Sequence, residues 1–383
     1  MRKDTISSLS NRQLIALVRA SLWQTPVELQ SFIDHYIDWD KIGKLAMQQT
    51  VGMLAIKGAL SLPTEILPPK EWIHKAYSFI ERNKRTHMLV DSCVATATEK
   101  LKDAGIPSIL LKGQAYARAY PDPILRQCGD IDLYVGDKNY FSAYKVSHQL
   151  GWESHEIFRP STKHYGCALK NVRIELHRIA ARLYPKSSDL KFQEWCQENL
   201  KDSERSIEIG GEPICVPSPL FNVVFVFTHM YNHFINGGIG LRHICDWTML
   251  LHVHYNELDR QQLKQCLKEF GLMRGWRFFA PIAVELLGLP KQECPFYSTE
   301  CSSSAAKIFS FIMMEGNFGR ARIKNPKRPK GYIAGKAYSL CELTSNLYSK
   351  LWIDPYKITG YYCNYVIKGI KWVMIDLLKR RTK

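Results

Sequence analysis

Apolar residues follow a helical period at the two ends of the chain and a strand period in its middle. Up to about residue 105 they recur every three or four positions, as in 11–22 and in the long segment 71–104, which Gly105 ends. Between 106 and 178 apolar and polar residues alternate over short runs, as in β-strands. We expect strands at 108–111, 131–135, 152–158, 164–169 and 172–177, and a helix at 138–150.

Helical periodicity returns after residue 185, interrupted by one hairpin. A Gly210-Gly211 turn joins the alternating runs 206–209 and 213–216. Helices are expected at 218–234, 239–255, 259–270 and 274–287. The pattern predicts an α+β fold with a small α/β core between helical regions. Its expected divisions are an N-terminal helical region at 1–104, the α/β core at 105–216, a helical domain at 217–320, and a basic linker with a helical tail at 321–383.

Two carboxylates share one face of the expected strand 131–135. In the run Asp130-Ile131-Asp132-Leu133, alternation puts both Asp side chains on one side and both apolar side chains on the other. Neighbouring carboxylates repel each other unless a cation lies between them, and Mg²⁺ prefers such oxygen ligands. The pair predicts metal-assisted phosphoryl or nucleotidyl transfer, but so short a motif is also common without a metal.

A third carboxylate is available on the expected strand 172–177. Arg173, Glu175 and His177 share its polar face, and Glu175 could complete a site that holds two metal ions. His177 could bind phosphate, orient Glu175 or make a structural hydrogen bond. The alternative for Glu175 is an ordinary solvent-facing side chain.

The segment before the Asp pair contains candidate phosphate ligands. Gly113 ends the expected strand 108–111 after Lys112, and a glycine at such a turn lets backbone amides approach a phosphate. Such turns are also common connectors. Arg126 could neutralise phosphate charge or orient an Asp, or it could be a solvated loop arginine.

A group of polar residues lies on the two helices expected after residue 217. His229 and His233 are one turn apart, and Arg242, His243 and Asp246 follow on the next helix. A His pair at this spacing can bind zinc, but no Glu occupies the position found in zinc proteases. We therefore favour a polar network between helices or a wall of the substrate cleft.

Composition and charge restrict the class of protein. The 383 residues are 46% hydrophobic, which indicates a folded protein, and a net charge of +16 favours anionic partners such as nucleotides or nucleic acid. No helix-turn-helix, zinc-finger or RNA-binding signature accompanies the basic run 320–330. The eleven Cys contain no C-x-x-C pair, and neither a secretory signal nor a membrane-spanning run is visible. We expect a cytoplasmic protein.

The motifs together resemble a known family. The string LKG…YPDP…R…GDIDLYV followed by IELH is similar to the uncharacterised bacterial nucleotidyltransferases, within the polymerase-β-like superfamily. Upstream, LKDAGIPSILLKG, and downstream, THMYNHF with LRHICDW, extend the resemblance over roughly residues 10 to 325. It implies a polymerase-β-like core with a small mixed sheet.

The resemblance also implies a reaction and roles for residues. Asp130, Asp132 and Glu175 match the three catalytic, metal-binding carboxylates, with Glu175 as the candidate general base, and Gly113 matches the phosphate-approach glycine. The chain departs from the superfamily pattern at Gln114, where Ser or Gly is usual, and in the longer interval from Gly113 to Asp130. The other expected nucleotide-binding residues are Lys112, Gln114, Arg126 and His177.

The implied activity is Mg²⁺-dependent nucleotidyl transfer. Two Mg²⁺ ions are expected as cofactors, with Mn²⁺ as a substitute. An NMP, with AMP favoured, would pass from an NTP to a hydroxyl or phosphate of a small-molecule, peptide or sugar acceptor, with release of pyrophosphate. The alternative is a non-catalytic nucleotide- or nucleic-acid-binding protein of the same fold.

Overall fold

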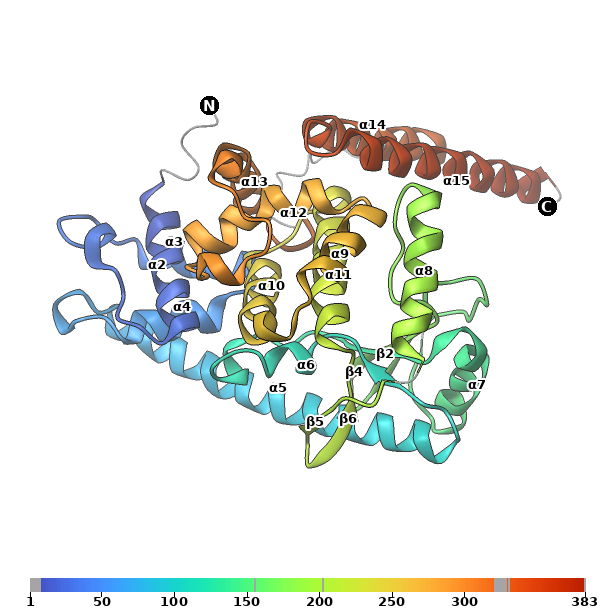
Figure 1. Cartoon of the computed structure of the whole chain (residues 1–383), viewed down its shortest axis with the longest axis horizontal. Helices are drawn as coiled ribbons and strands as arrows, with labels where there is room; N and C mark the ends of the chain where they lie inside the picture. Colours follow the sequence, from blue (N-terminus) through green and yellow to red (C-terminus); the bar gives the residue numbers. More distant parts are fainter. Residues whose placement is uncertain (1–7, 155, 202, 320–328, 330, 382–383) are drawn as a thin grey trace.

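The N-terminal part of the described chain is helical. A computed structural model describes residues 8–154, 156–201, 203–319, 329 and 331–381. Helices α2 (Leu9–Trp23), α3 (Trp39–Gln48) and α4 (Gly52–Leu60) pack together, and α5 (Lys70–Asp103) runs from them along the whole lower side of the molecule (Figure 1). Helix α5 ends as predicted, before Gly105, which has a positive φ of 74°.

A four-stranded mixed sheet forms the centre of the predicted α/β core. Its strands are β1 (Ile109–Leu110), β2 (Ile131–Tyr134), β3 (His164–Leu169) and β4 (Val172–His177), in the order β1-β2-β4-β3. Strand β2 is parallel to β4, and the two outer pairs are antiparallel. The short helix α6 (Gln114–Ala117) follows β1, and α7 (Gly136–Gln149) follows β2. The fold is α+β, as the pattern predicts.

The prediction of a strand at 152–158 is wrong. In the described part of this segment, backbone pairing is limited to one bridge between Glu153 and Ala168. Side chains satisfy the edge of β3 instead: Ser154 Oγ donates to the Gly166 carbonyl oxygen at 2.8 Å, and Glu156 Oε2 accepts from the Gly166 N–H at 3.0 Å. Because these side chains replace a strand partner, the segment has no reason to extend along β3.

The later elements follow the predicted order with one further correction. They are α8 (Lys186–Leu200), the hairpin β5 (Ser206–Ile209) with β6 (Glu212–Cys215), and helices α9 (Pro219–Asn236), α10 (Leu241–His254), α11 (Arg260–Glu269), α12 (Met273–Pro281) and α13 (Ser302–Glu315). The single helix expected at 274–287 ends at Pro281 and continues as a π-helical turn, Ile282–Leu286. Proline has no N–H for the α-helical hydrogen bond, which accounts for the change.

Two clusters of buried apolar side chains stabilise the structure. We call the first the helical core; it joins α2–α4 with α9–α13 and includes Tyr116, Phe227 and Trp247. The second, the sheet core, packs α5 against the sheet and the β5–β6 hairpin and includes Leu133 and Leu176. The sheet and the helices α9–α13 therefore pack in different apolar clusters.

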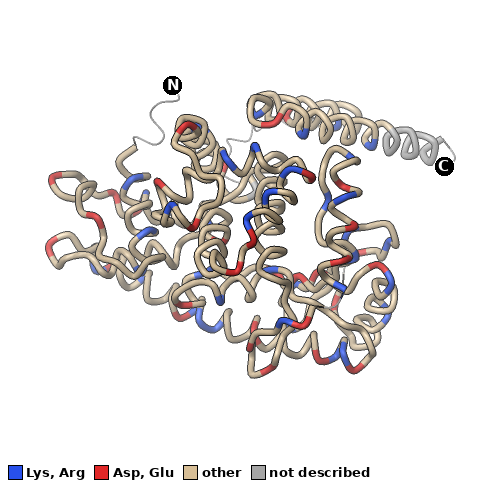
Figure 2. The backbone as a smooth tube through the Cα atoms, in the orientation of Figure 1, with Lys and Arg blue, Asp and Glu red and all other residues tan. Residues whose placement is uncertain are grey.

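The C-terminal helices α14 (Tyr332–Lys350) and α15 (Pro355–Arg381) lie along one side of the molecule (Figure 1). The basic run at 320–330 lies outside the described residues, except for residue 329. In the described part of the chain, no helix combines the length and apolar character needed to cross a membrane. Basic and acidic positions intermingle along the backbone in Figure 2, so the basic excess is dispersed over the described elements.

Candidate active site

The parallel pairing of β2 with β4 brings the predicted carboxylates together. Asp132 is the register partner of Glu175, so the two side chains lie on one face of the sheet. Asp130 immediately precedes β2 and is exposed, whereas Asp132 and Glu175 are buried. Each of the three offers a carboxylate oxygen within 4.8 Å of the others.

Two cationic or hydrogen-bonding groups contact Asp132. Lys112 Nζ and His177 Nε2 each lie 2.8 Å from Asp132 Oδ1. Burial alone would raise the pKa of Asp132, but Lys112 and His177 outweigh it and hold that pKa well below its usual range. Burial would also raise the pKa of Glu175, but other groups, above all the hydrogen bond from His177, lower it to about 2. Both carboxylates are therefore ionised at neutral pH.

Burial and neighbouring charges also shift the pKa values of Asp130 and Lys112. Desolvation in the site and the charge of Asp132 raise the pKa of Asp130. Desolvation opposes a charged Lys112, but the nearby carboxylates raise its pKa overall. Negative charge is therefore concentrated around the Lys112 ammonium group.

Gly113 has a backbone conformation that requires glycine. Its φ is +66° and its ψ is −116°, a region that side-chain-bearing L-residues rarely adopt. A Cβ at this position would lie 3.2 Å from the Asp130 carbonyl oxygen. Gly113 therefore allows the turn after β1 to pass close to the strand that presents Asp130 and Asp132.

A cavity of about 200 Å³ opens in front of these carboxylates. Its opposite wall comes from α9 and α10, which supply the residues expected there: His229, His233, Arg242, His243 and Asp246. Burial lowers the pKa of all three histidines, to about 4 for His233 and about 3 for His243. The rings are neutral at physiological pH, and of the two interpretations from sequence, a cleft wall fits this position.

Arg126 is not a solvated loop arginine. Its side chain is 5% exposed and makes a two-pronged ion pair with Asp246, Nε to Oδ1 at 2.8 Å and Nη2 to Oδ2 at 3.0 Å. The Tyr120 hydroxyl donates to the same Asp246 oxygen at 2.7 Å. Arg126 thus joins the segment before β2 to α10, and its guanidinium lines the cavity.

The cavity wall contains buried polar atoms without partners. Among the described residues, five of the twelve such side-chain atoms belong to cavity-lining residues. They are Tyr116 Oη, Arg126 Nη1, Asp132 Oδ2, His164 Nδ1 and Arg242 Nε. Because unsatisfied buried groups are rare in folded proteins, their concentration here indicates a polar ligand.

The structure brings most of the predicted site residues to this cavity. Its lining includes Lys112, Gly113, Arg126, Asp130, Asp132 and Glu175. His177 lies behind the lining, fully buried, in contact with Asp132 and Glu175.

Gln114 is the exception among the predicted nucleotide-binding residues. Its side chain is buried away from the cavity, where Nε2 donates to Asp91 Oδ1 on α5 and Cys128 Sγ lies 3.3 Å from Oε1. Its role in nucleotide binding stays a prediction, one to which this side-chain position lends no support.

Sequence reasoning missed three lining residues with polar side-chain groups: Tyr116, Lys163 and His164. Lys163 immediately precedes β3 and His164 is its first residue, and nothing in the local pattern marks either residue as functional. Desolvation and the charge of Lys112 lower the pKa of Lys163. The alternation of 164–169 was the one pattern that could have indicated His164, because it puts His164 on the same face as Gly166. It does not show which strand lies beside this one.

The residues present fit a divalent cation. Three carboxylates converge, and Asp132 Oδ2 is buried without a hydrogen-bond partner among the described residues. Oxygen donors of this kind are the ligands that Mg²⁺ prefers. The donor set therefore agrees with the metal that the sequence predicts.

Comparison with known proteins identifies the family of the chain. The model of a family described as "Uncharacterised nucleotidyltransferase" matches residues 35–288, more than half of the chain. A solved structure, the crystal structure of an antigenic nucleotidyltransferase-like protein from Paracoccidioides brasiliensis, aligns with a TM-score of 0.34 and 15% identity, over 56% of this chain and 96% of that one. No curated protein sequence matches the chain. By its family match, the chain belongs to the uncharacterised nucleotidyltransferases.

Proposed function

We propose that the protein is a Mg²⁺-dependent nucleotidyltransferase. It would transfer a nucleoside monophosphate, with AMP favoured, from an NTP to a hydroxyl or phosphate oxygen of an acceptor. The observation that supports this most is the convergence of Asp130, Asp132 and Glu175 at a cavity whose other walls carry basic side chains. Acidic residues on one side and cations on the other suit a metal-bound triphosphate.

The residues that line the cavity would bind the metal and the phosphate groups. Asp130, Asp132 and Glu175 would hold the metal, which when bound polarises the phosphate oxygens and neutralises their charge. Lys163 makes no ion pair among the described residues, and with Arg242 it is available for phosphate oxygens. Arg126 keeps its charge through Asp246 and offers its unpaired Nη1 to the cavity.

The reaction forms one bond to the α-phosphorus and breaks another. An acceptor oxygen forms a bond to the α-phosphorus, the bond from that phosphorus to the bridging oxygen breaks, and pyrophosphate leaves. The proton of an acceptor hydroxyl passes to a base. Glu175 is the candidate base from sequence, and as an ionised carboxylate it is in the form that accepts a proton.

The proposal is tested by pyrophosphate release and product mass. We expect the wild-type protein, incubated with mixed NTPs and a small-molecule extract, to release pyrophosphate only with Mg²⁺ and to give a product heavier by one NMP. Asp132→Asn should lower that release by at least about a hundredfold, since it removes charge where the transition state needs a metal.

The matched control is Asp103→Asn, the same chemical change at the exposed end of α5, at a residue that does not line the cavity. Release that is unchanged in Asp132→Asn would disprove the proposal. Mg²⁺-dependent NTP binding without any release would favour the non-catalytic alternative. Binding of RNA with a steep salt dependence would instead favour a nucleic-acid acceptor.

A further inference from the structure

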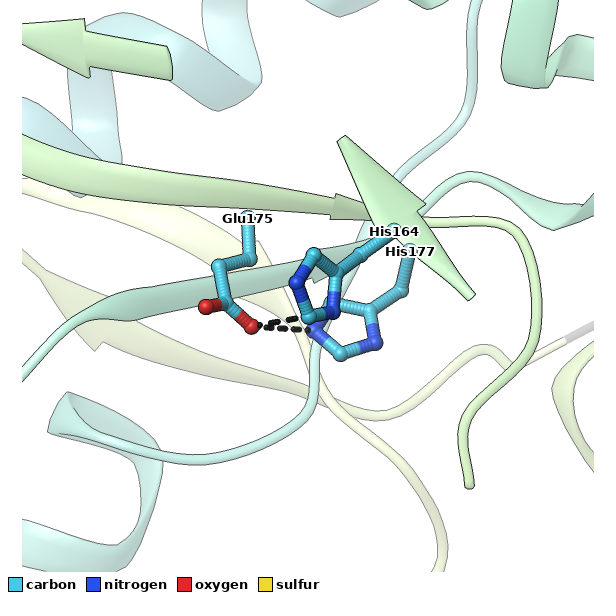
Figure 3. Close-up of side chains that lie close together, drawn as sticks. All are labelled: His164, Glu175 and His177. Atoms are coloured by element: carbon cyan, nitrogen blue, oxygen red, sulfur yellow. Dashed lines mark ion pairs between the residues drawn. The ribbon is translucent and has the colours of Figure 1, made fainter. Parts of the chain in front are cut away.

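Two histidines flank Glu175 on the side away from Asp130. Strands β3 and β4 are antiparallel, with His164 opposite His177 and Gly166 opposite Glu175. Because register partners and alternate residues share a face, both imidazoles lie on the same side of the sheet as the Glu175 carboxylate. Figure 3 shows both rings turned toward one carboxylate oxygen of Glu175.

The separations between these atoms fit three ligands of one metal ion. His164 Nδ1 lies 3.2 Å from Glu175 Oε2, and His177 Nε2 lies 3.3 Å from the same oxygen. Ligand atoms about 2.0–2.2 Å from a tetrahedral or octahedral ion are themselves about 3.0–3.5 Å apart. The three residues each offer a ligand atom within 4.8 Å of the others, so little movement would be needed.

The hydrogen bonding of His164 supports ligation. Its Nδ1 is buried and has no hydrogen-bond partner among the described residues, although it faces Glu175. A cation between this nitrogen and the carboxylate would satisfy both groups.

The second ring nitrogen of His177 is held as in metal sites. His177 Nδ1 lies 3.3 Å from the carbonyl oxygen of Ile179. Metal-binding histidines usually donate their outer N–H to a carbonyl or carboxylate, which directs the other nitrogen to the metal. Without a metal, His177 Nε2 carries the proton that contacts Asp132 and Glu175; with Nδ1–H donated to Ile179 instead, Nε2 would offer its lone pair to a cation beside Glu175.

We propose that His164, Glu175 and His177 bind a transition-metal dication, for which Zn²⁺ is the best fit. This site shares Glu175 with the carboxylate site but differs from it in chemistry, because two of its ligands are imidazole nitrogens. Imidazole suits Zn²⁺, whereas Mg²⁺ takes oxygen ligands. Binding here requires neither nucleotide nor turnover, so it does not depend on the proposed transferase activity.

The test separates the two sites by their metals. Zn²⁺ affinity is measured by competition with a chromophoric chelator, and Mg²⁺ affinity by calorimetry, on full-length protein without nucleotide. His164→Gln should weaken Zn²⁺ binding by at least about tenfold and leave Mg²⁺ binding within about twofold, because it removes a nitrogen ligand only. Asp130→Asn should do the reverse, since Asp130 belongs only to the carboxylate group.

Controls cover folding and adventitious binding. His74→Gln makes the same change on the exposed face of α5 and should alter neither affinity. His177 is fully buried, so His177→Gln is interpreted only if its melting curve matches that of the wild type; His164, 26% exposed in its side chain, is the safer variant.

X-ray absorption at the zinc edge gives a structural readout. We expect a first shell of nitrogen and oxygen with imidazole scattering in the wild type, and weaker imidazole scattering in His164→Gln. Absence of Zn²⁺ binding, a sulfur-containing shell, or equal Zn²⁺ affinity in wild type and His164→Gln would each overturn the proposal. Loss of pyrophosphate release in Asp132→Asn with no Zn²⁺ site would leave the transferase proposal standing alone.

Discussion

Single residues set the close approach of backbone and carboxylates at the site. Gly113 allows the turn after β1 to pass the Asp130 carbonyl, because its conformation and the absence of a Cβ remove two obstacles. Gly105 also has a positive φ, of 74°, but a Cβ there would meet nothing within 4 Å. A comparison of the two glycines therefore distinguishes the effect of backbone strain, which both positions have, from the effect of a Cβ close to a neighbouring atom, which only Gly113 has.

Replacing each glycine by alanine should give different results at the site. Gly105→Ala should lose about 1–2 kcal/mol of unfolding free energy through backbone strain and keep Mg²⁺-dependent pyrophosphate release. Gly113→Ala should lose about 1–3 kcal/mol and also lower that release by at least about tenfold, because its Cβ displaces Asp130. Urea unfolding and the release assay measure the two effects, and equal release in both variants would contradict the role given to Gly113.

At the scale of elements, one buried ion pair joins the two walls of the cavity. Arg126 comes from the segment before β2, and Asp246 from α10, 120 residues later. Both side chains are about 5% exposed, so neither charge can be replaced by water if its partner is lost. The relative position of sheet and α10 therefore depends on this pair.

Asp246→Asn should destabilise the fold by about 3–5 kcal/mol, because it leaves the buried Arg126 guanidinium without its anion. Tyr120→Phe, which removes one hydrogen bond to the same carboxylate, should cost only about 1 kcal/mol. Chemical denaturation of both variants gives the comparison. A loss below about 1 kcal/mol in Asp246→Asn would show that the pair does not hold the two elements together.

The elements that alternate most regularly were also the easiest to predict from sequence. Strands β2 and β4 and the β5–β6 hairpin follow their patterns within a residue, because burial on one face imposes the period. The segment 152–158 alternates too, but side chains of Ser154 and Glu156 bind the edge of β3 in place of its backbone. Local pattern does not reveal such competition for hydrogen bonds.

Partnerships across long sequence separations could not be predicted. The three carboxylates were identified because each lies in an alternating run, whereas the Arg126–Asp246 pair has no local signal. Gln114 shows the same limit at shorter range: adjacent to Gly113, its side chain nevertheless turns to Asp91 on α5. A positive φ at Gly113 redirects the chain, and sequence spacing alone does not contain that information.

At the scale of the whole molecule, the cavity lies where the two apolar clusters meet. Tyr116 and Val226 of its lining belong with the helical core, whereas Asp132 and Glu175 lie on strands of the sheet core. A ligand in the cavity would therefore contact both parts of the molecule. The divisions of the chain expected at 104, 216 and 320 stay predictions.

ATP with Mg²⁺ should raise the melting temperature of the whole molecule in one transition. A ligand at a hundred times its dissociation constant stabilises the native state by about 2.7 kcal/mol. Differential scanning calorimetry with and without EDTA measures the effect, and Asp132→Asn should abolish the Mg²⁺-dependent part. A shift that persists in EDTA would show nucleotide binding without the metal.

The pairing of Asp132 with Glu175 has a consequence for how the protein folds. The two residues come from parallel strands, and α7 and β3 separate them along the chain. Closing that loop costs entropy before any contact repays it, so the unfolded chain holds no preformed cage for a cation. A bound metal should therefore slow unfolding far more than it speeds folding, and a cation that binds these carboxylates would do so only after the sheet is complete.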